Sequence, residues 1–283
     1  MITLPGTGIE LPIELSRLLE GFSFERNFEG NSQASVYQCI KGSDELYIKA
    51  EETNRYIINE YRILKWLYGK LPVPEVKYFG VSDIYTFLLG TAVKGKKAGV
   101  SDKVLEPREQ TVRLLADGLK MIQSVDTEEC PFKIGYEEKY QSLIENIEER
   151  FKKKFVDKIS HQYAEMEYLG QFRFGKQTDR PFGSCNEYAD WLLLTKPAQD
   201  GDVCFTHGDY GLTNTFIDRG KLSGFIDTGE SGIGCKWHDT ATCVRSIGYH
   251  SKNLDEKNFL LDIFFDQLEL APDWDKINYF LWL

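Results

Sequence analysis

Two aspartates and one asparagine occupy a short stretch of the chain in which their spacing suits phosphoryl transfer. Asp209 stands in His-Gly-Asp, Asn214 follows five residues later, and Asp227 opens Asp-Thr-Gly. Arg219-Gly220 is a tight-turn signal between two short apolar runs, so residues 215–226 are predicted to form a hairpin. A hairpin returns the backbone close to its start, so we expect the three side chains to gather.

Each of these residue types has a use in that chemistry. Mg²⁺ takes oxygen ligands, which the carboxylate of Asp227 and the amide of Asn214 can supply against nucleotide phosphates. The carboxylate of Asp209 can accept a hydrogen bond from a substrate hydroxyl and orient it in line with the γ-phosphorus. The alternative is that these are ordinary turn residues. The joint spacing, Asp-x₄-Asn, hairpin, Asp-x-Gly, favours the catalytic interpretation, with His207 as a buried orienting residue.

The elements ahead of this segment are predicted to be mostly strands. Side chains alternate over 35–40 and over 45–50, and the turn residues 41–44 between them indicate a hairpin. Residues 55–68 switch to helical spacing, and Pro72 and Pro74 are expected to stop that helix. Two further strands are predicted at Val76–Phe79 and Ile84–Leu89.

A polar, glycine-bearing stretch at 94–103 is predicted to be a linker. It divides the chain into an N-terminal nucleotide-binding lobe, residues 1–93, and a C-terminal catalytic and substrate-binding lobe, residues 94–283. The second part is predicted to be mainly helical, because its apolar residues recur at helical spacing. Its predicted helices lie within 112–125, 140–155, 187–194 and 257–268, and its predicted strands are 203–206, 215–218 and 222–226.

The composition excludes several classes of protein. With a formal charge of −10 over 283 residues, the chain lacks the basic balance of a nucleic-acid binder. No apolar run approaches the roughly 18–20 residues that span a bilayer. None of the 6 cysteines forms a Cys-x-x-Cys pair, so a zinc site is not expected. We expect a cytoplasmic protein with reduced thiols that binds neither nucleic acid nor membrane.

The catalytic segment resembles that of the aminoglycoside phosphotransferase family, within the wider protein-kinase-like fold. The similarity is closest to the aminoglycoside 3′-phosphotransferases and spans nearly the whole chain. Beyond the catalytic segment, the matching stretches are Gly69–Pro74, Ser223–Asp227, Lys236-Trp237 with Asp239, Val244–Ile247 and Pro272–Ile277.

The resemblance implies an α+β, two-lobed fold with a small β-rich N-lobe carrying one helix and a larger, mainly helical C-lobe. It implies ATP-dependent O-phosphorylation of an aminoglycoside antibiotic at a 3′-type hydroxyl, which confers resistance. The expected cofactors are ATP and Mg²⁺, and the expected partner is a cationic aminoglycoside.

The resemblance also implies residue roles. Asp209 matches the catalytic aspartate, and Asn214 and Asp227 match the Mg²⁺ ligands. Lys49 matches the strand lysine that binds the α- and β-phosphates, and Glu60 matches the helix glutamate that pairs with it.

The remaining matches concern the nucleotide and the catalytic loop. Tyr47 corresponds to a residue that stacks on adenine, and Ser32 lies in the loop over the phosphates. The segment from Thr91 to Val93 matches the hinge whose backbone contacts adenine. Asp239 resembles the aspartate that steadies the catalytic loop.

The substrate half of the sequence departs from the family pattern. Residues 171–180 are net basic where the family is acid-rich, with Glu165, Glu167 and Asp179 as the nearest acids. Glu230 stands where many relatives carry arginine. In the family the helical tail continues into acidic residues that bind the antibiotic, and the given sequence reaches Phe280-Leu-Trp-Leu283 without such residues. The basic stretch 171–180 and Glu230 favour an alternative, a kinase of the same fold acting on a sugar or an amino alcohol. A non-enzymatic nucleotide-binding module is a third hypothesis.

Overall fold

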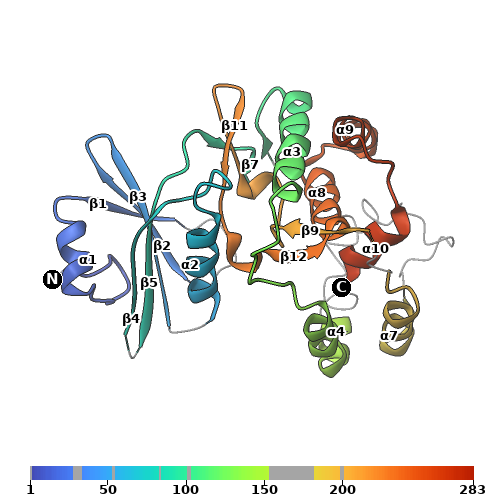
Figure 1. Cartoon of the computed structure of the whole chain (residues 1–283), viewed down its shortest axis with the longest axis horizontal. Coiled ribbons are helices and arrows are strands. Elements are labelled where there is room, and N and C mark those ends of the chain that lie inside the picture. Colours follow the sequence, from blue (N-terminus) through green and yellow to red (C-terminus); the bar gives the residue numbers. More distant parts are fainter. Residues whose placement is uncertain are drawn as a thin grey trace. The chain divides into compact units, whose positions relative to one another are not determined.

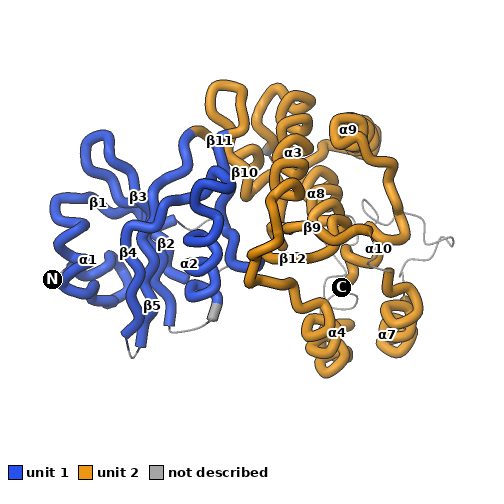
Figure 2. The backbone as a smooth tube through the Cα atoms, in the orientation of Figure 1, with its two compact units in different colours: residues 1–94, 223–230 blue, residues 95–222, 231–283 orange. Residues whose placement is uncertain are grey.

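The computed structural model describes residues 2–27, 34–52, 55–82, 84–100, 103–152, 182–197 and 201–283. The chain forms two compact units, one of residues 1–94 with 223–230 and one of residues 95–222 with 231–283 (Figure 2). They differ from the predicted lobes, 1–93 and 94–283, mainly in the segment 223–230, which belongs to the first unit and carries Asp227. The nucleotide-binding and substrate-binding roles given to the two lobes stay predictions.

The first unit is built on an antiparallel sheet of five strands in the order β1-β2-β3-β5-β4 (Figure 1). The hairpin predicted over residues 35–50 is confirmed, because β2 and β3 pair from Ser35 opposite Ala50 to Lys41 opposite Asp44. The elements of this unit are α1 (Ile13–Leu18), β1 (Ser23–Asn27), β2 (Ser35–Lys41), β3 (Asp44–Glu52), α2 (Arg55–Leu67), β4 (Val76–Val81), β5 (Tyr85–Thr91) and the short helix η3 (Thr228–Glu230).

The two faces of this sheet are covered by different helices. Alternate residues of a strand point to opposite faces, so Ile48 and Ala50 of β3 face one way and Lys49 faces the other. Ile48 and Ala50 belong to a core cluster with Leu15 of α1. Leu88, which lies opposite Lys49 in the β3–β5 ladder, packs instead with residues of α2. Lys49 is therefore placed on the α2 side of the sheet by the pleat of the strand.

The segment that returns to the first unit is fixed by hydrogen bonds to the loops around β4 and β5. The backbone N–H of Phe225 donates to the carbonyl oxygen of Pro72 at 2.9 Å. The hydroxyl of Ser223 donates to the carbonyl oxygen of Lys94 at 2.5 Å. A side chain at Gly224 would lie 2.5 Å from the Pro72 oxygen, so only glycine allows this close approach. These contacts explain why Asp227 belongs to the first unit.

The second unit is mainly helical, as predicted, and its described residues form small sheets ordered β11-β10-β6, β12-β9 and β7-β8. The chain leaves this unit within β11, whose last three residues belong to the first unit. Its elements are β6 (Lys96–Lys97), β7 (Gly99–Val100), β8 (Lys103–Val104), α3 (Arg108–Gln123), α4 (Tyr136–Glu145), α5 (Ile147–Phe151), α7 (Cys185–Leu194), β9 (Val203–Thr206), η2 (Leu212–Asn214), β10 (Thr215–Asp218), β11 (Lys221–Phe225), β12 (Gly232–Cys235), α8 (Lys236–His250), α9 (Leu254–Leu268) and α10 (Trp274–Trp282).

Helix α8 is the centre of the second unit and contacts α3, α9, α10 and β9. Its start is held by the carboxylate of Asp202, which accepts hydrogen bonds from Lys276 at 2.5 Å and from the indole of Trp237 at 2.9 Å. Lys236 adds an ion pair to the same carboxylate at 2.9 Å. One buried aspartate therefore joins β9, α8 and α10.

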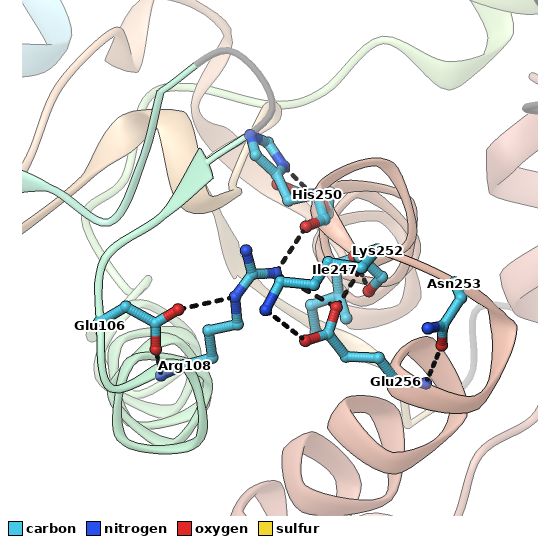
Figure 3. Close-up of polar contacts among 9 residues, drawn as sticks. Glu106, Arg108, Ile247, His250, Lys252, Asn253 and Glu256 are labelled. Carbon is cyan, nitrogen blue, oxygen red and sulfur yellow. Dashed lines mark hydrogen bonds and ion pairs between the residues drawn. The ribbon is translucent and has the colours of Figure 1, made fainter.

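The other end of α8 is held by Arg108, at the start of α3 (Figure 3). Its guanidinium donates to the carbonyl oxygen of His250 at 3.0 Å and to the carboxylate of Glu256 at 3.3 Å. The same carboxylate accepts the backbone N–H of Lys252 at 2.6 Å, while Asn253 caps α9. Arg108 thus links the first turn of α3 to the junction of α8 and α9.

Several predicted element bounds differ in detail from the structure. Helix α2 ends at Leu67, because Gly69 takes a positive φ of 78° and closes the helix before Pro72. The expected linker at 94–103 contains the short strands β6 and β7 and the start of β8. The single helix expected over 140–155 is interrupted at Asn146, between α4 and α5. In the described part of the chain, no helix is long and apolar enough to span a membrane.

Candidate active site

The ammonium group of Lys49 is the centre of the polar cluster in the first unit. It donates to both carboxylate oxygens of Glu60, at 2.7 and 3.0 Å, and to the carboxylate of Asp227 at 2.5 Å. Glu60 comes from the buried face of α2, and its side chain is only 4% exposed. The strand, the helix and the returning segment therefore each contribute one charged group.

Burial has the largest influence on the pKa of each member of the Lys49–Glu60 pair. It raises the pKa of Glu60 and by itself would lower the pKa of Lys49. The pKa of Lys49 is nevertheless raised, because Glu60 and Asp227 both lie within hydrogen-bond distance of the ammonium group. Lys49 is therefore a permanent cation at neutral pH, which is what a group that binds phosphate oxygens needs.

Asp227 combines an exposed carboxylate with an unusual backbone. Its side chain is 39% exposed, so the carboxylate is accessible to a ligand. Its φ of 60° lies in the left-handed region, which aspartate tolerates better than most residues but which still costs free energy. The next residue, Thr228, is buried, and among the described residues nothing hydrogen-bonds its hydroxyl. Neighbouring residues must therefore stabilise the backbone conformation of this turn.

Asp209 and Asn214 form the polar cluster of the second unit. The side-chain N–H₂ of Asn214 donates to the backbone oxygen of Asp209 at 2.8 Å and to its carboxylate at 3.2 Å. Helix η2 makes this possible, because it brings Asn214 back toward the residue five positions earlier. The carboxylate of Asp209 is 61% exposed, and the guanidinium of Arg245 from α8 lies 3.7 Å from it. The carboxylate of Asp209 is thus oriented by Asn214 and exposed to solvent.

Asp239 fixes the loop that carries Asp209. It is fully buried in the first turn of α8, and its carboxylate accepts the backbone N–H groups of His207 at 2.6 Å and of Gly208 at 2.9 Å. The hydroxyl of Ser231 donates to the carbonyl oxygen of His207 at 2.9 Å. His207 is buried, as expected. Burial raises the pKa of Asp239, and the two backbone N–H groups and His207 oppose that rise.

The predicted nucleotide contacts lie on the Lys49 side of the sheet or at the end of β5. Tyr47 is half-buried and shares a face of β3 with Lys49. The backbone N–H of Thr91 donates to the carbonyl oxygen of Glu75 at 3.0 Å, so it is already used. Among the described residues, none makes a backbone hydrogen bond to the main chain of Val93. Ser32 lies outside the described residues.

The structure thus gathers the predicted residues in two groups, one in each unit. Lys49, Glu60 and Asp227 meet in the first, and Asp209 and Asn214 meet in the second. Among the residues that sequence reasoning missed are Tyr56 and Arg245. Arg245 lies in the stretch Val244–Ile247 that carried the resemblance, and this position could have indicated that it lies near the site. No pattern in the sequence indicates that Tyr56 does.

With this geometry in place, comparison with known proteins assigns the family. A model of the phosphotransferase enzyme family matches residues 26–279. The chain belongs to this family. Its predicted α+β, kinase-like fold is confirmed, because solved phosphotransferases share it over nearly their whole length.

Three similar proteins illustrate the range of this phosphotransferase family. An aminoglycoside 3′-phosphotransferase of Enterococcus faecalis is 32% identical over 282 residues, which cover 95% of this chain and 96% of that protein. The crystal structure of a type VIII aminoglycoside 3′-phosphotransferase has a TM-score of 0.68 at 22% identity, covering 95% of both chains. An aminoglycoside phosphotransferase from Streptomyces rimosus, solved with ADP and streptomycin, has a TM-score of 0.68 at 18% identity and covers 95% of this chain and 94% of that one.

Proposed function

We propose that this chain transfers the γ-phosphoryl group of ATP to the 3′-hydroxyl of an aminoglycoside and so confers resistance to it. The observation that carries the proposal is the ammonium group of Lys49, which Glu60 and Asp227 hold on one face of the sheet. Relatives similar along nearly the whole chain are named as aminoglycoside 3′-phosphotransferases, and they supply the acceptor class.

The first unit supplies the nucleotide contacts. Lys49 binds the α- and β-phosphates, and Glu60 keeps the ammonium group directed at them. Tyr47 packs against the adenine ring, and the main chain of the segment from Thr91 to Val93 meets the edge of that ring. Ser32 keeps its predicted role over the phosphates.

Asp209 receives the acceptor hydroxyl. Its exposed carboxylate accepts a hydrogen bond from that group and holds its oxygen in line with the γ-phosphorus. The contact from Asn214 and the two backbone hydrogen bonds to Asp239 fix the carboxylate before the substrate arrives. Catalysis by positioning of this kind requires a loop that does not reorganise.

The donor set fits Mg²⁺, because both predicted ligands offer oxygen. Asp227 presents a half-exposed carboxylate. Asn214 uses its N–H₂ group for both of its hydrogen bonds to Asp209, so its amide oxygen is not engaged by them. Mg²⁺ would neutralise charge on the transferred group and is held in such sites by few protein ligands together with phosphates and water. Asp227 and Asn214 therefore keep their predicted roles as its ligands.

The test is ADP release by the purified protein with Mg·ATP and a kanamycin-type aminoglycoside. The matched control is the 3′-deoxy analogue of the same compound, which keeps every ammonium group but lacks the acceptor oxygen. We expect ADP release only with the hydroxylated compound. Equal release with both compounds would place the phosphate elsewhere, and release with simple sugars or amino alcohols alone would replace the aminoglycoside by another acceptor.

A further inference from the structure

The aromatic ring of Tyr56 lies directly against the backbone of Gly229. A Cβ atom on Gly229 would meet two ring carbons of Tyr56, Cε2 and Cζ, each at 2.9 Å. Gly229 does not have a positive φ, so its backbone conformation suits any residue. The ring of Tyr56, and not the backbone, is therefore what requires glycine at this position.

Both residues are tied to the candidate site. Tyr56 lies in the first turn of α2, four residues before Glu60 and on the same side of the helix. Gly229 lies two residues after Asp227, whose left-handed φ of 60° needs support from its surroundings. The contact thus joins the helix that holds Lys49 to the turn that presents the carboxylate.

The ring of Tyr56 also packs against the hydrophobic core of the first unit. Tyr56 packs against the core cluster of Ile57, Leu64 and Leu88, which fixes α2 on the sheet. A side chain that is packed on one side by a core and on the other by a backbone transmits the position of one to the other. The ring can therefore set where the turn of Asp227 lies relative to Lys49.

We infer that Tyr56 is a positioning residue, whose ring fixes the Asp227–Gly229 turn so that the carboxylate is preset for the metal of Mg·ATP. This rests on the proposed function, because it takes Asp227 as a metal ligand. The role belongs to the ring, since it is ring carbons that meet Gly229. Removing a group that orients a metal ligand typically weakens metal binding by about tenfold or more.

The experiment measures binding of a non-hydrolysable ATP analogue by calorimetry as a function of Mg²⁺ concentration. Tyr56→Leu is expected to need about tenfold more Mg²⁺ for the same nucleotide affinity. Tyr56→Phe keeps the ring that meets Gly229, so its Mg²⁺ requirement should stay closer to that of the parent than to that of Tyr56→Leu. The matched control is Tyr61→Leu on the same helix, which removes a ring stacked on Phe79 at 3.9 Å and should leave the Mg²⁺ dependence unchanged.

A second arm tests the contact itself through Gly229. Gly229→Ala places a methyl group against the ring and should shift the Mg²⁺ dependence as Tyr56→Leu does. In the double variant the smaller leucine makes room, so its shift should be no larger than that of Tyr56→Leu alone. Gly229→Ala also decides the matter if Tyr56→Leu does not fold.

The inference and the proposed function can fail separately, because nucleotide binding needs no acceptor. A parent that binds Mg·ATP analogue but phosphorylates no aminoglycoside would end the proposed acceptor and leave the role of Tyr56 standing. Unchanged Mg²⁺ dependence in both Tyr56→Leu and Gly229→Ala, or an equal change in Tyr61→Leu, would overturn the inference whatever the acceptor is.

Discussion

The ammonium nitrogen of Lys49 lies 2.7 Å from a carboxylate oxygen of Glu60, and both side chains are largely buried, 18% and 4% exposed. Removing one partner of a buried pair leaves the other charge without compensation, which costs about 3 kcal/mol or more. We therefore expect Lys49→Ala to lower the free energy of unfolding in urea by about 3 kcal/mol. It should also abolish binding of Mg·ATP.

A second substitution separates the loss of stability in Lys49→Ala from its loss of nucleotide binding. Glu60→Gln added to Lys49→Ala removes the uncompensated carboxylate, so the double variant should regain much of the stability. It should not regain nucleotide binding, because no ammonium group remains for the phosphates. A double variant no more stable than Lys49→Ala would contradict the pairing as the source of the instability.

Asp209→Asn tests the proposed role of this carboxylate in binding the acceptor hydroxyl. An amide cannot accept the hydroxyl proton, and such a change typically lowers turnover by about 100-fold or more. Its size and shape are retained, so Mg·ATP analogue binding by calorimetry should stay at the parental level. Turnover within about tenfold of the parent would show that Asp209 is not the catalytic group.

Asp202 is predicted to make the second unit sensitive to acid. Burial by itself would raise the pKa of Asp202, but hydrogen bonds from Lys276, Lys236 and Trp237 outweigh it and lower the pKa below its ordinary value of 3.8. A lowered folded-state pKa contributes stability that is present above the unfolded value and is lost as the pH falls through the folded value. At pH 7, Asp202→Asn should cost about 2 kcal/mol of unfolding free energy.

The pH dependence separates this carboxylate from an ordinary surface pair. As the pH falls from about 5 to below the folded pKa, the difference in unfolding free energy between parent and Asp202→Asn should shrink toward zero. Glu137→Gln is the control, because its pair with Lys196 is exposed and should contribute nothing measurable. A difference that does not change with pH would contradict the assignment.

Arg108 is predicted to hold the junction of three helices in the second unit. Arg108→Met removes the hydrogen bonds to the His250 carbonyl and to Glu256 but keeps the apolar stem, so we expect a loss of about 2 kcal/mol in urea unfolding. Lys252→Ala removes the other cation near Glu256, at 3.7 Å and 63% exposed, and should have no measurable effect. Equal effects would mean that charge alone, and not the geometry in Figure 3, stabilises the junction.

Much of the fold followed from local patterns, and the failures have physical causes. Alternation located β2 and β3, and helical spacing located α2, α3 and α9. Helix α8 was missed because it is buried on most of its circumference, so it has no polar face to reveal its period. Its residues Thr240, Thr242 and Gly248 are also weak helix formers.

The missed helix α10 did carry a signal. Asp273 caps it by accepting the backbone N–H of Lys276, a spacing that is typical of a helix start. The aromatic residues that fill the rest of α10 suit strands as well as helices, so periodicity alone does not separate the two.

The candidate site shows the same limit. The face of Lys49 follows from strand alternation, and its partner Glu60 followed from the family resemblance. The positive φ of Asp227 and the contact of Tyr56 with Gly229 depend on segments far apart in the chain, so no local sequence pattern could predict them. Where long-range packing decides, a single sequence gives no signal.

The position of the new phosphate on the product tests the central claim most directly. After complete reaction of a kanamycin-type aminoglycoside with Mg·ATP, phosphorus–proton correlation NMR identifies the oxygen that carries the phosphate. We predict a single phosphomonoester on the 3′-oxygen, absent when Asp209→Ala replaces the parent. A phosphate on any other oxygen, or no phosphorylated aminoglycoside from an active, nucleotide-binding protein, would contradict the account.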